Sequence, residues 1–178
     1  MKKICLFLLC GVFLVACNNE VKKDEPVEAK AEKMTTPVDL PYTATFSSNW
    51  STEVSDADLK TVLATYKDWA DGNISGLSKA MGDTVVIDMN NGDHLTKINA
   101  DLMKIWTTNR DSLRSVKIEM SAWHKMYSTD KKQEFIVTWY DETDTYKSGK
   151  VDSAAYHDIN GLKNGKIVYY GQFKRPKK

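Results

Sequence analysis

Two side chains of this sequence have the chemistry and the surroundings that proton transfer needs. Asp88 follows the apolar run 85–87 and precedes a turn, and burial against an apolar wall raises the pKa of a carboxylate toward the range of a general base. His157 alternates with Ala155 and Ile159, so its imidazole could donate a hydrogen bond to a developing oxyanion. The alternatives are an exposed aspartate that caps the turn and a histidine held by core contacts.

Several aromatic side chains lie on the predicted helices and strands and could line a pocket for a small hydrophobic ligand. Their alternative role is core packing, which aromatic side chains also serve. The residues predicted to line the pocket are Tyr66, Trp69, Trp106, Tyr156 and Tyr169.

The remaining chemistry-bearing residues predict neither a metal nor a cofactor. The three histidines are scattered, without the close spacing of a zinc site. No serine stands in a Gly-x-Ser-x-Gly elbow, and the glycines match neither a Walker loop nor a dinucleotide fingerprint. The histidines are His94, His124 and His157.

The N-terminus predicts export and attachment to a membrane. Two lysines precede a dozen apolar residues, which fits a signal peptide and is too short for a membrane span. The sequence Leu14-Val15-Ala16-Cys17 that follows resembles the bacterial lipobox. The resemblance implies removal of residues 1–16 and acylation of Cys17, which would be the attachment to the membrane. Asn18 and Asn19 favour an outer-membrane location, because an aspartate after the cysteine signals retention at the inner membrane.

Cysteine and charge usage exclude other classes of protein. Cys5 and Cys10 would leave with the leader, so the mature chain has no thiol for a disulfide or a thiolate site. Lys2 and Lys3 would leave too, so the mature chain would have 23 of the 25 basic residues and all 24 acidic ones. This balance predicts no nucleic-acid binding.

Composition divides the rest of the chain into three parts. Residues 17–37 mix both charges with proline and carry no aromatic residue, which is typical of a flexible tether. Residues 38–54 contain Tyr42, Phe46 and Trp50, which predicts an arm that packs on the domain. The domain itself covers residues 55–178.

The domain pattern predicts an α+β fold. A capping box at Ser55 opens a helix that ends near Gly72, a short helix follows at 74–81, and a strand at 84–89. Asp93 is expected to cap a further helix. Alternation at 116–122, a run that is apolar on both faces at 135–140, a strand at 150–159 and another after Asn164-Gly165 predict antiparallel sheet.

Two stretches resemble the nuclear transport factor 2-like superfamily and its SnoaL-like, polyketide-cyclase-like branch. They are WADGNISGLSKAMGDTVVIDMNNGDHLTKI and GLKNGKIVYYGQF. The resemblance implies a cone, in which a curved, mostly antiparallel sheet wraps N-terminal helices. It places Asp88 where ketosteroid isomerase has its general base and His157 where that enzyme has its second acid. The helical tyrosine of that enzyme falls nearest Thr65, which is a departure.

These observations predict a lipid-anchored envelope protein whose domain binds a small molecule or a partner without turnover. One alternative is an isomerase, cyclase or dehydratase that uses Asp88 with His157. Another alternative is a structural homodimer that presents Trp123, Trp139 and Tyr140 to its partner.

Overall fold

The computed structural model describes residues 39–177. The predicted leader, Cys17 and the whole of the predicted tether lie outside the described residues. Among these described residues, no helix is long and apolar enough to span a membrane.

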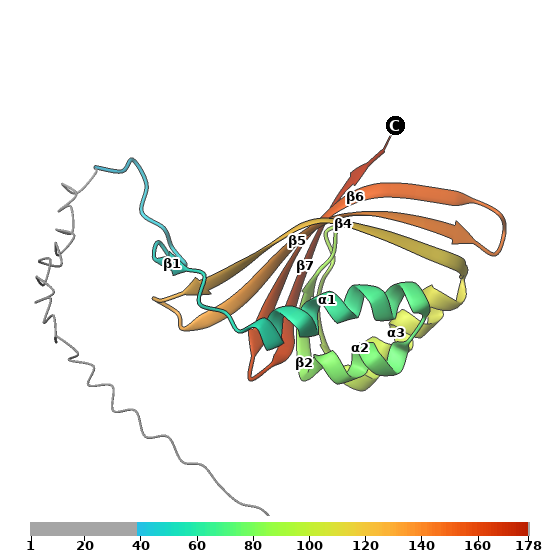
Figure 1. The fold of residues 1–178 in the computed structure, drawn as a ribbon, viewed down its shortest axis with the longest axis horizontal. Helices are drawn as coiled ribbons and strands as arrows, with labels where there is room; N and C mark the ends of the chain where they lie inside the picture. The colour runs from blue at the N-terminus through green and yellow to red at the C-terminus, as the bar shows by residue number, and fades with distance from the viewer. Residues whose placement is uncertain (1–38, 178) are drawn as a thin grey trace, which may run out of the picture. The chain divides into compact units, whose positions relative to one another are not determined.

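Three helices and seven strands follow one another along residues 39–177 (Figure 1). The helices are α1 (Asp56–Asp71), α2 (Ile74–Ala80) and α3 (Asn99–Asp111). The strands are β1 (Trp50–Ser51), β2 (Met81–Asp88), β3 (His94–Ile98), β4 (Leu113–Ser128), β5 (Gln133–Tyr146), β6 (Val151–Lys163) and β7 (Lys166–Pro176).

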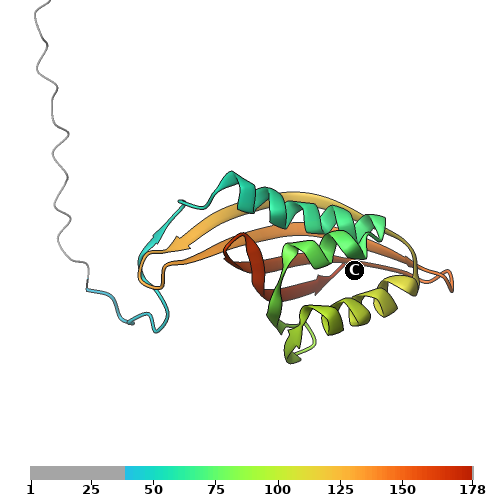
Figure 2. The same cartoon turned by 90° about the horizontal axis from the view of Figure 1, so that it is seen from below.

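All seven strands form one mixed sheet in the order β1-β4-β5-β6-β7-β2-β3. Every neighbouring pair is antiparallel except β2 and β7, which run parallel. Figure 2 shows the long strands arching over the helices, which all lie on one face of the sheet. We call this the inner face and the opposite one the outer face. The predicted α+β fold with a curved, mostly antiparallel sheet is confirmed.

The hydrophobic core lies between the helices and the inner face. Val62 of α1 and Leu102 of α3 are 0 and 1% exposed, and they meet strand residues that are equally buried, Ile136 and Ile167. Alternation sends Val85 and Ile87 of β2 into the same core. The core therefore fixes which side chains of each strand face the helices.

Helix α1 begins and ends where its sequence predicts. The Ser55 hydroxyl accepts a hydrogen bond from the Asp58 amide at 3.0 Å, which satisfies one of the free amides of the first turn. Gly72 follows the helix with a φ of 73°, a conformation that glycine adopts without a Cβ clash. The helix thereby projects Tyr66 and Trp69 toward the sheet.

The helix expected from Asp93 begins six residues later, at Asn99. Residues 94–98 instead form β3, which pairs with β2 from Asp88↔His94 to Thr84↔Ile98. The turn at 90–93 closes this hairpin, so Asp93 does not cap a helix. Leu95 and Ile98 are three residues apart, a spacing that also fits a helix, which explains the wrong expectation.

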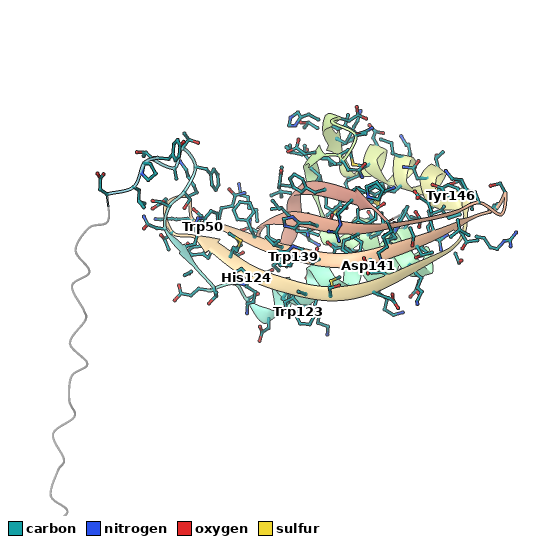
Figure 3. All side chains as sticks on the ribbon, turned by 90° about the horizontal axis from the view of Figure 1, so that it is seen from above. Trp50, Trp123, His124, Trp139, Asp141 and Tyr146 are labelled. Carbon is teal, nitrogen blue, oxygen red and sulfur yellow. The ribbon has the colours of Figure 1, made fainter. Side chains whose placement is uncertain are left out.

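Residues 46–51 contact the ends of β4 and β5. The rings of Phe46 and Trp50 lie 6.0 and 5.9 Å from that of Phe135, and Tyr42 is 87% exposed. Asp130, in the β4–β5 turn, accepts hydrogen bonds from the main chain of Ser48 and from Asn49. Figure 3 shows Trp50 at one end of these strands and Tyr146 at the other.

We predict that Ser55→Ala lowers the free energy of unfolding by ~1 kcal/mol, because the first turn of α1 loses its cap. Chemical denaturation measures this change. Ser75→Ala, the same substitution at an exposed position of α2, should change it by less than ~0.5 kcal/mol. Equal losses in the two variants would contradict the role of the cap.

Candidate functional site

A cavity of about 180 Å³ lies between the three helices and the inner face of the sheet. Its walls are mainly aromatic and apolar, and a few polar groups converge on it, which is typical of a small-molecule site. The helices and the β2–β3 connection contribute Thr65, Tyr66, Trp69, Leu77, Met89, Trp106 and Asn109. The strands contribute Met81, Tyr140, Glu142, Tyr156, Asn160, Tyr170 and Gln172.

The Asp158 carboxyl on β6 organises the tyrosines of this cavity. Its Oδ2 accepts hydrogen bonds from the hydroxyls of Tyr66 at 3.1 Å, Tyr140 at 2.9 Å and Tyr170 at 3.0 Å. The side chain is 0% exposed, and its Oδ1 has no hydrogen-bond partner in the described residues. Burial raises the pKa of Asp158 to about 7, against the three hydrogen bonds, which lower it.

The network extends from Tyr66 to two neighbouring strands. The Tyr66 oxygen lies 2.6 Å from the Thr138 hydroxyl and accepts a hydrogen bond from the Asn160 amide at 3.2 Å. With Thr138 as the donor, the Tyr66 proton is free to point at Asp158. One helix and three strands are thus joined through a single carboxyl oxygen.

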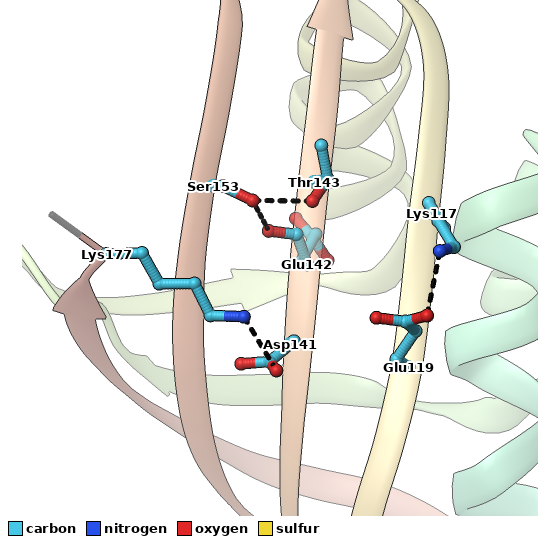
Figure 4. A network of polar contacts seen from close by, with 7 residues as sticks. All are labelled: Lys117, Glu119, Asp141, Glu142, Thr143, Ser153 and Lys177. Carbon is cyan, nitrogen blue, oxygen red and sulfur yellow. Dashed lines mark hydrogen bonds and ion pairs between the residues drawn. The ribbon is translucent and has the colours of Figure 1, made fainter.

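Glu142 is the ionisable acid in the cavity wall. Burial raises its pKa to about 8, and the charges of Asp144 and Asp158 act in the same direction. Hydrogen bonding from the Trp69 indole opposes the shift. The preceding residue, Asp141, lies on the outer face and pairs with Lys177 at 2.7 Å (Figure 4). Glu142 is therefore a carboxyl that is mostly protonated at neutral pH.

The structure places Asp88 on the outer face, away from this cavity. Its Oδ1 lies 2.5 Å from His94 Nδ1, and its Oδ2 accepts a hydrogen bond from the Tyr169 hydroxyl at 2.8 Å. These contacts, with His94 first, hold the pKa of Asp88 below its usual value. The expectation of a raised pKa at an apolar wall is wrong, because the side chain is 46% exposed and well hydrogen-bonded.

His157 also lies on the outer face. Its ring stacks between Trp139, at 5.0 Å, and Phe173, at 5.5 Å. The structure therefore does not bring His157 and Asp88 together in one cavity. The next residue along β6, Asp158, is the one that faces the helices.

Four of the five aromatic residues predicted for a pocket line the cavity: Tyr66, Trp69, Trp106 and Tyr156. The fifth, Tyr169, lies on the outer face, and its neighbour Tyr170 takes the inner position. Tyr140 and Trp139 likewise point to opposite faces, with Tyr140 3% and Trp139 39% exposed. Trp123 is paired with Thr138, whose side chain faces the helices, so Trp139 is the one residue of the predicted dimer surface on the outer face.

A second hollow, of about 830 Å³, lies on the outer face beside residues 46–50. Phe46, Trp50, Phe135, Val137 and Tyr169 are among its lining residues. It is broad and apolar, and no carboxyl is among its lining residues. The inner cavity is the better candidate because ionisable groups converge on it.

The described residues hold no group of three or more His, Cys, Asp or Glu side chains suited to a metal ion. The cavity presents a carboxyl, amides and tyrosine hydroxyls. These groups can donate and accept hydrogen bonds, and the carboxyl can exchange a proton.

Comparison with known proteins informs the fold. No protein family and no curated protein matches the sequence. Solved structures do match. An LEH-like epoxide hydrolase of Mycobacterium tuberculosis is 8% identical with a TM-score of 0.57, over 67% of this chain and 84% of the other.

Two further structures agree. An NTF-2-like protein of unknown function from Burkholderia xenovorans has 14% identity and a TM-score of 0.52, over 69% of this chain and 86% of the other. A putative SnoaL-like polyketide cyclase from Jannaschia has 10% identity and a TM-score of 0.55, over 70% and 89%. The chain has the nuclear transport factor 2-like fold. At these identities the likeness concerns the fold alone.

Within this nuclear transport factor 2-like domain, sequence reasoning missed Asp158 and Glu142. On each face of β6 a polar residue stands among apolar ones. His157 lies between Ala155 and Ile159 on one face, and Asp158 lies between Ala154 and Leu162 on the other. The two faces therefore could not be told apart locally. The available signal was that Glu142, Asp158 and Gln172 share a face on adjacent strands, which becomes visible only with the register in hand.

We predict that the free energy of unfolding falls as the pH rises from about 5 to 8. The folded state keeps a proton on Asp158 up to about pH 7, whereas the unfolded chain loses it near 3.8. More protons are then bound in the folded state, so stability decreases with rising pH, by at most ~1.4 kcal/mol per pH unit for each such group.

Asp158→Asn keeps an oxygen for the tyrosines and should flatten this dependence when denaturation is followed at several pH values. Glu142→Gln should flatten the pH dependence of the free energy of unfolding at the upper end of this pH range. Asp101→Asn, at an exposed carboxyl with a lowered pKa, is the control and should leave the slope unchanged in this window. Parallel curves for the wild type and Asp158→Asn would contradict the assignment.

Proposed function

We propose that this chain is a lipid-anchored envelope protein whose nuclear transport factor 2-like domain binds a small molecule in the inner cavity without turning it over. The observation that carries the proposal is the cavity itself, in which apolar walls surround Glu142 and the tyrosines held by Asp158. Such a combination of apolar area and few polar groups binds and orients a small ligand.

The anchor part of the proposal is supported by the sequence. The lipobox-like segment ends at Cys17, and each buried methylene of an acyl chain contributes ~0.8 kcal/mol to membrane attachment. The residues after it favour the outer membrane. The homodimer stays a prediction.

A second candidate function is acid–base catalysis in the same cavity. Glu142 lines the wall and has a pKa of about 8, which is close to the value that proton transfer at neutral pH needs. In this version Glu142 replaces Asp88 and His157 as the acid or base. The epoxide hydrolase and the putative cyclase among the structural neighbours have the same fold. The two functions differ in whether the protein releases the bound molecule unchanged or as a product.

We predict that protein purified from its own host carries a small molecule in native mass spectrometry. Met89→Trp places an indole in the cavity wall and should remove that mass. Ile105→Trp, on the exposed side of α3, should retain it. An empty wild type, or equal retention in Met89→Trp, would overturn the proposed site. Conversion of the released molecule by the wild type, but not by Glu142→Gln, would select the catalytic alternative.

We also predict that metabolic labelling with a fatty acid marks the wild-type protein and sends it to the membrane fraction. Cys17→Ser should remove both the label and the membrane association, because the lipobox-like segment then ends in a residue without the sulfur that is acylated. Asn18→Ala should keep both. An unlabelled wild type would refute the anchor and leave the cavity proposal intact.

A further inference from the structure

We propose that the inner cavity takes a small organic cation, such as an ammonium or quaternary ammonium compound, held by Glu142 and by the aromatic walls. This inference rests on the proposed function and names the class of its ligand.

The acidic groups around the cavity lack cationic partners. Glu142, Asp144 and Asp158 lie on the inner side of β5 and β6, and none of the three forms an ion pair in the described part of the chain. The Oδ1 atoms of Asp144 and Asp158 are buried without a hydrogen-bond partner. A cation inside the cavity would offset the repulsion that these carboxyls exert on one another.

The two nearby basic side chains are already used. Lys174 Nζ pairs with Asp152 at 2.9 Å, at the end of the sheet. Arg110 donates to the main-chain oxygens of Trp69 and Ala70, both at 2.9 Å, and so satisfies the carbonyls at the end of α1. Neither is within ion-pair distance of Glu142. Lys174 favours ionised Glu142 only from a distance, so a positive charge in direct contact with this carboxyl would come from a ligand.

The walls suit a cation independently of the carboxyls. Trp69, Trp106, Tyr140 and Tyr156 line the cavity, and the negative face of an aromatic ring attracts a nearby cation. The protein uses this contact at the rim, where Lys174 Nζ lies 5.6 Å from the centre of the Tyr156 ring. A neutral ligand would gain only apolar contact from the same rings.

Size limits the ligand further. An apolar cavity of about 150 Å³ admits benzene. The cavity here, of about 180 Å³, therefore admits a molecule only slightly larger than benzene. Choline is of this size and its charge does not change with pH, which makes it a suitable probe.

Binding of a cation should be coupled to loss of a proton from Glu142. The groups that act on this carboxyl are Asp144 and Tyr140 on the same strand, Asp158 and Tyr156 on β6, Tyr170 and Lys174 on β7, and Trp69 on α1. Because the free protein holds the proton up to about pH 8, choline affinity should rise with pH between about 6 and 8 and then level off.

The experiment compares choline with dimethylbutanol, its carbon isostere, by titration calorimetry on the full chain. The two probes have nearly the same shape and differ in charge. At about pH 8 we expect choline to bind ~10-fold or more tightly than the isostere, with release of a proton that shows as a buffer-dependent heat.

Two variants locate the effect. Glu142→Gln should lower choline affinity ~10-fold and remove the pH dependence while leaving isostere binding within ~3-fold. Trp106→Leu keeps an apolar wall and should weaken choline alone. Glu119→Gln is the control, because Glu119 is exposed and pairs with Lys117 on the outer side of the sheet (Figure 4).

The outcomes separate the ligand class from the function. If the isostere binds as tightly as choline, the cavity is a binding site for neutral molecules and the cation inference is overturned. If neither probe binds at a concentration of ~10 mM, the cavity is not a specific site for either of them, and the cation inference is overturned too. The proposed function is then tested separately, by native mass spectrometry of protein purified from its own host.

Discussion

The arrangement of the cavity depends on one oxygen atom, Asp158 Oδ2. Three tyrosine hydroxyls converge on it from α1, β5 and β7, so it connects the helical layer to the middle of the sheet. A buried carboxyl is costly unless it is hydrogen-bonded, and here three donors meet that cost on one of its two oxygens. The rings of Tyr66, Tyr140 and Tyr170 are thereby held in the cavity wall, which makes the site preformed.

The carboxyls of Asp158 and Glu142 both lie at the inner cavity but have different surroundings. Asp158 is enclosed by tyrosines, whereas Glu142 faces the cavity, where the Trp69 indole and the charge of Lys174 favour its ionised form. Both keep their protons to higher pH than a carboxyl in water because burial outweighs their hydrogen bonds. The site is therefore sensitive to any charge that enters it, because such a charge changes the free energy of ionising both carboxyls.

The fold was predictable from the sequence because turns and caps are local. Ser55, Gly72 and Asn164-Gly165 set the limits of elements by their own chemistry. The site was less predictable, because it depends on which face of each strand turns inward. His157 was named in place of Asp158, and Tyr169 in place of Tyr170. A shift of one residue reverses a strand's faces, and the irregular pairing at Gly161/Leu162 prevents counting back from the hairpin.

The contacts of residues 46–51 with Phe135 have a consequence for orientation. Phe135 and Glu142 are on the same strand, and seven residues of extended chain separate them by about 23 Å. The polypeptide thus enters the domain at one end of β5 while the carboxyl of the cavity lies toward the other. A domain held through residues 46–51 would therefore have this carboxyl at the far end of the strand from the point where the chain enters.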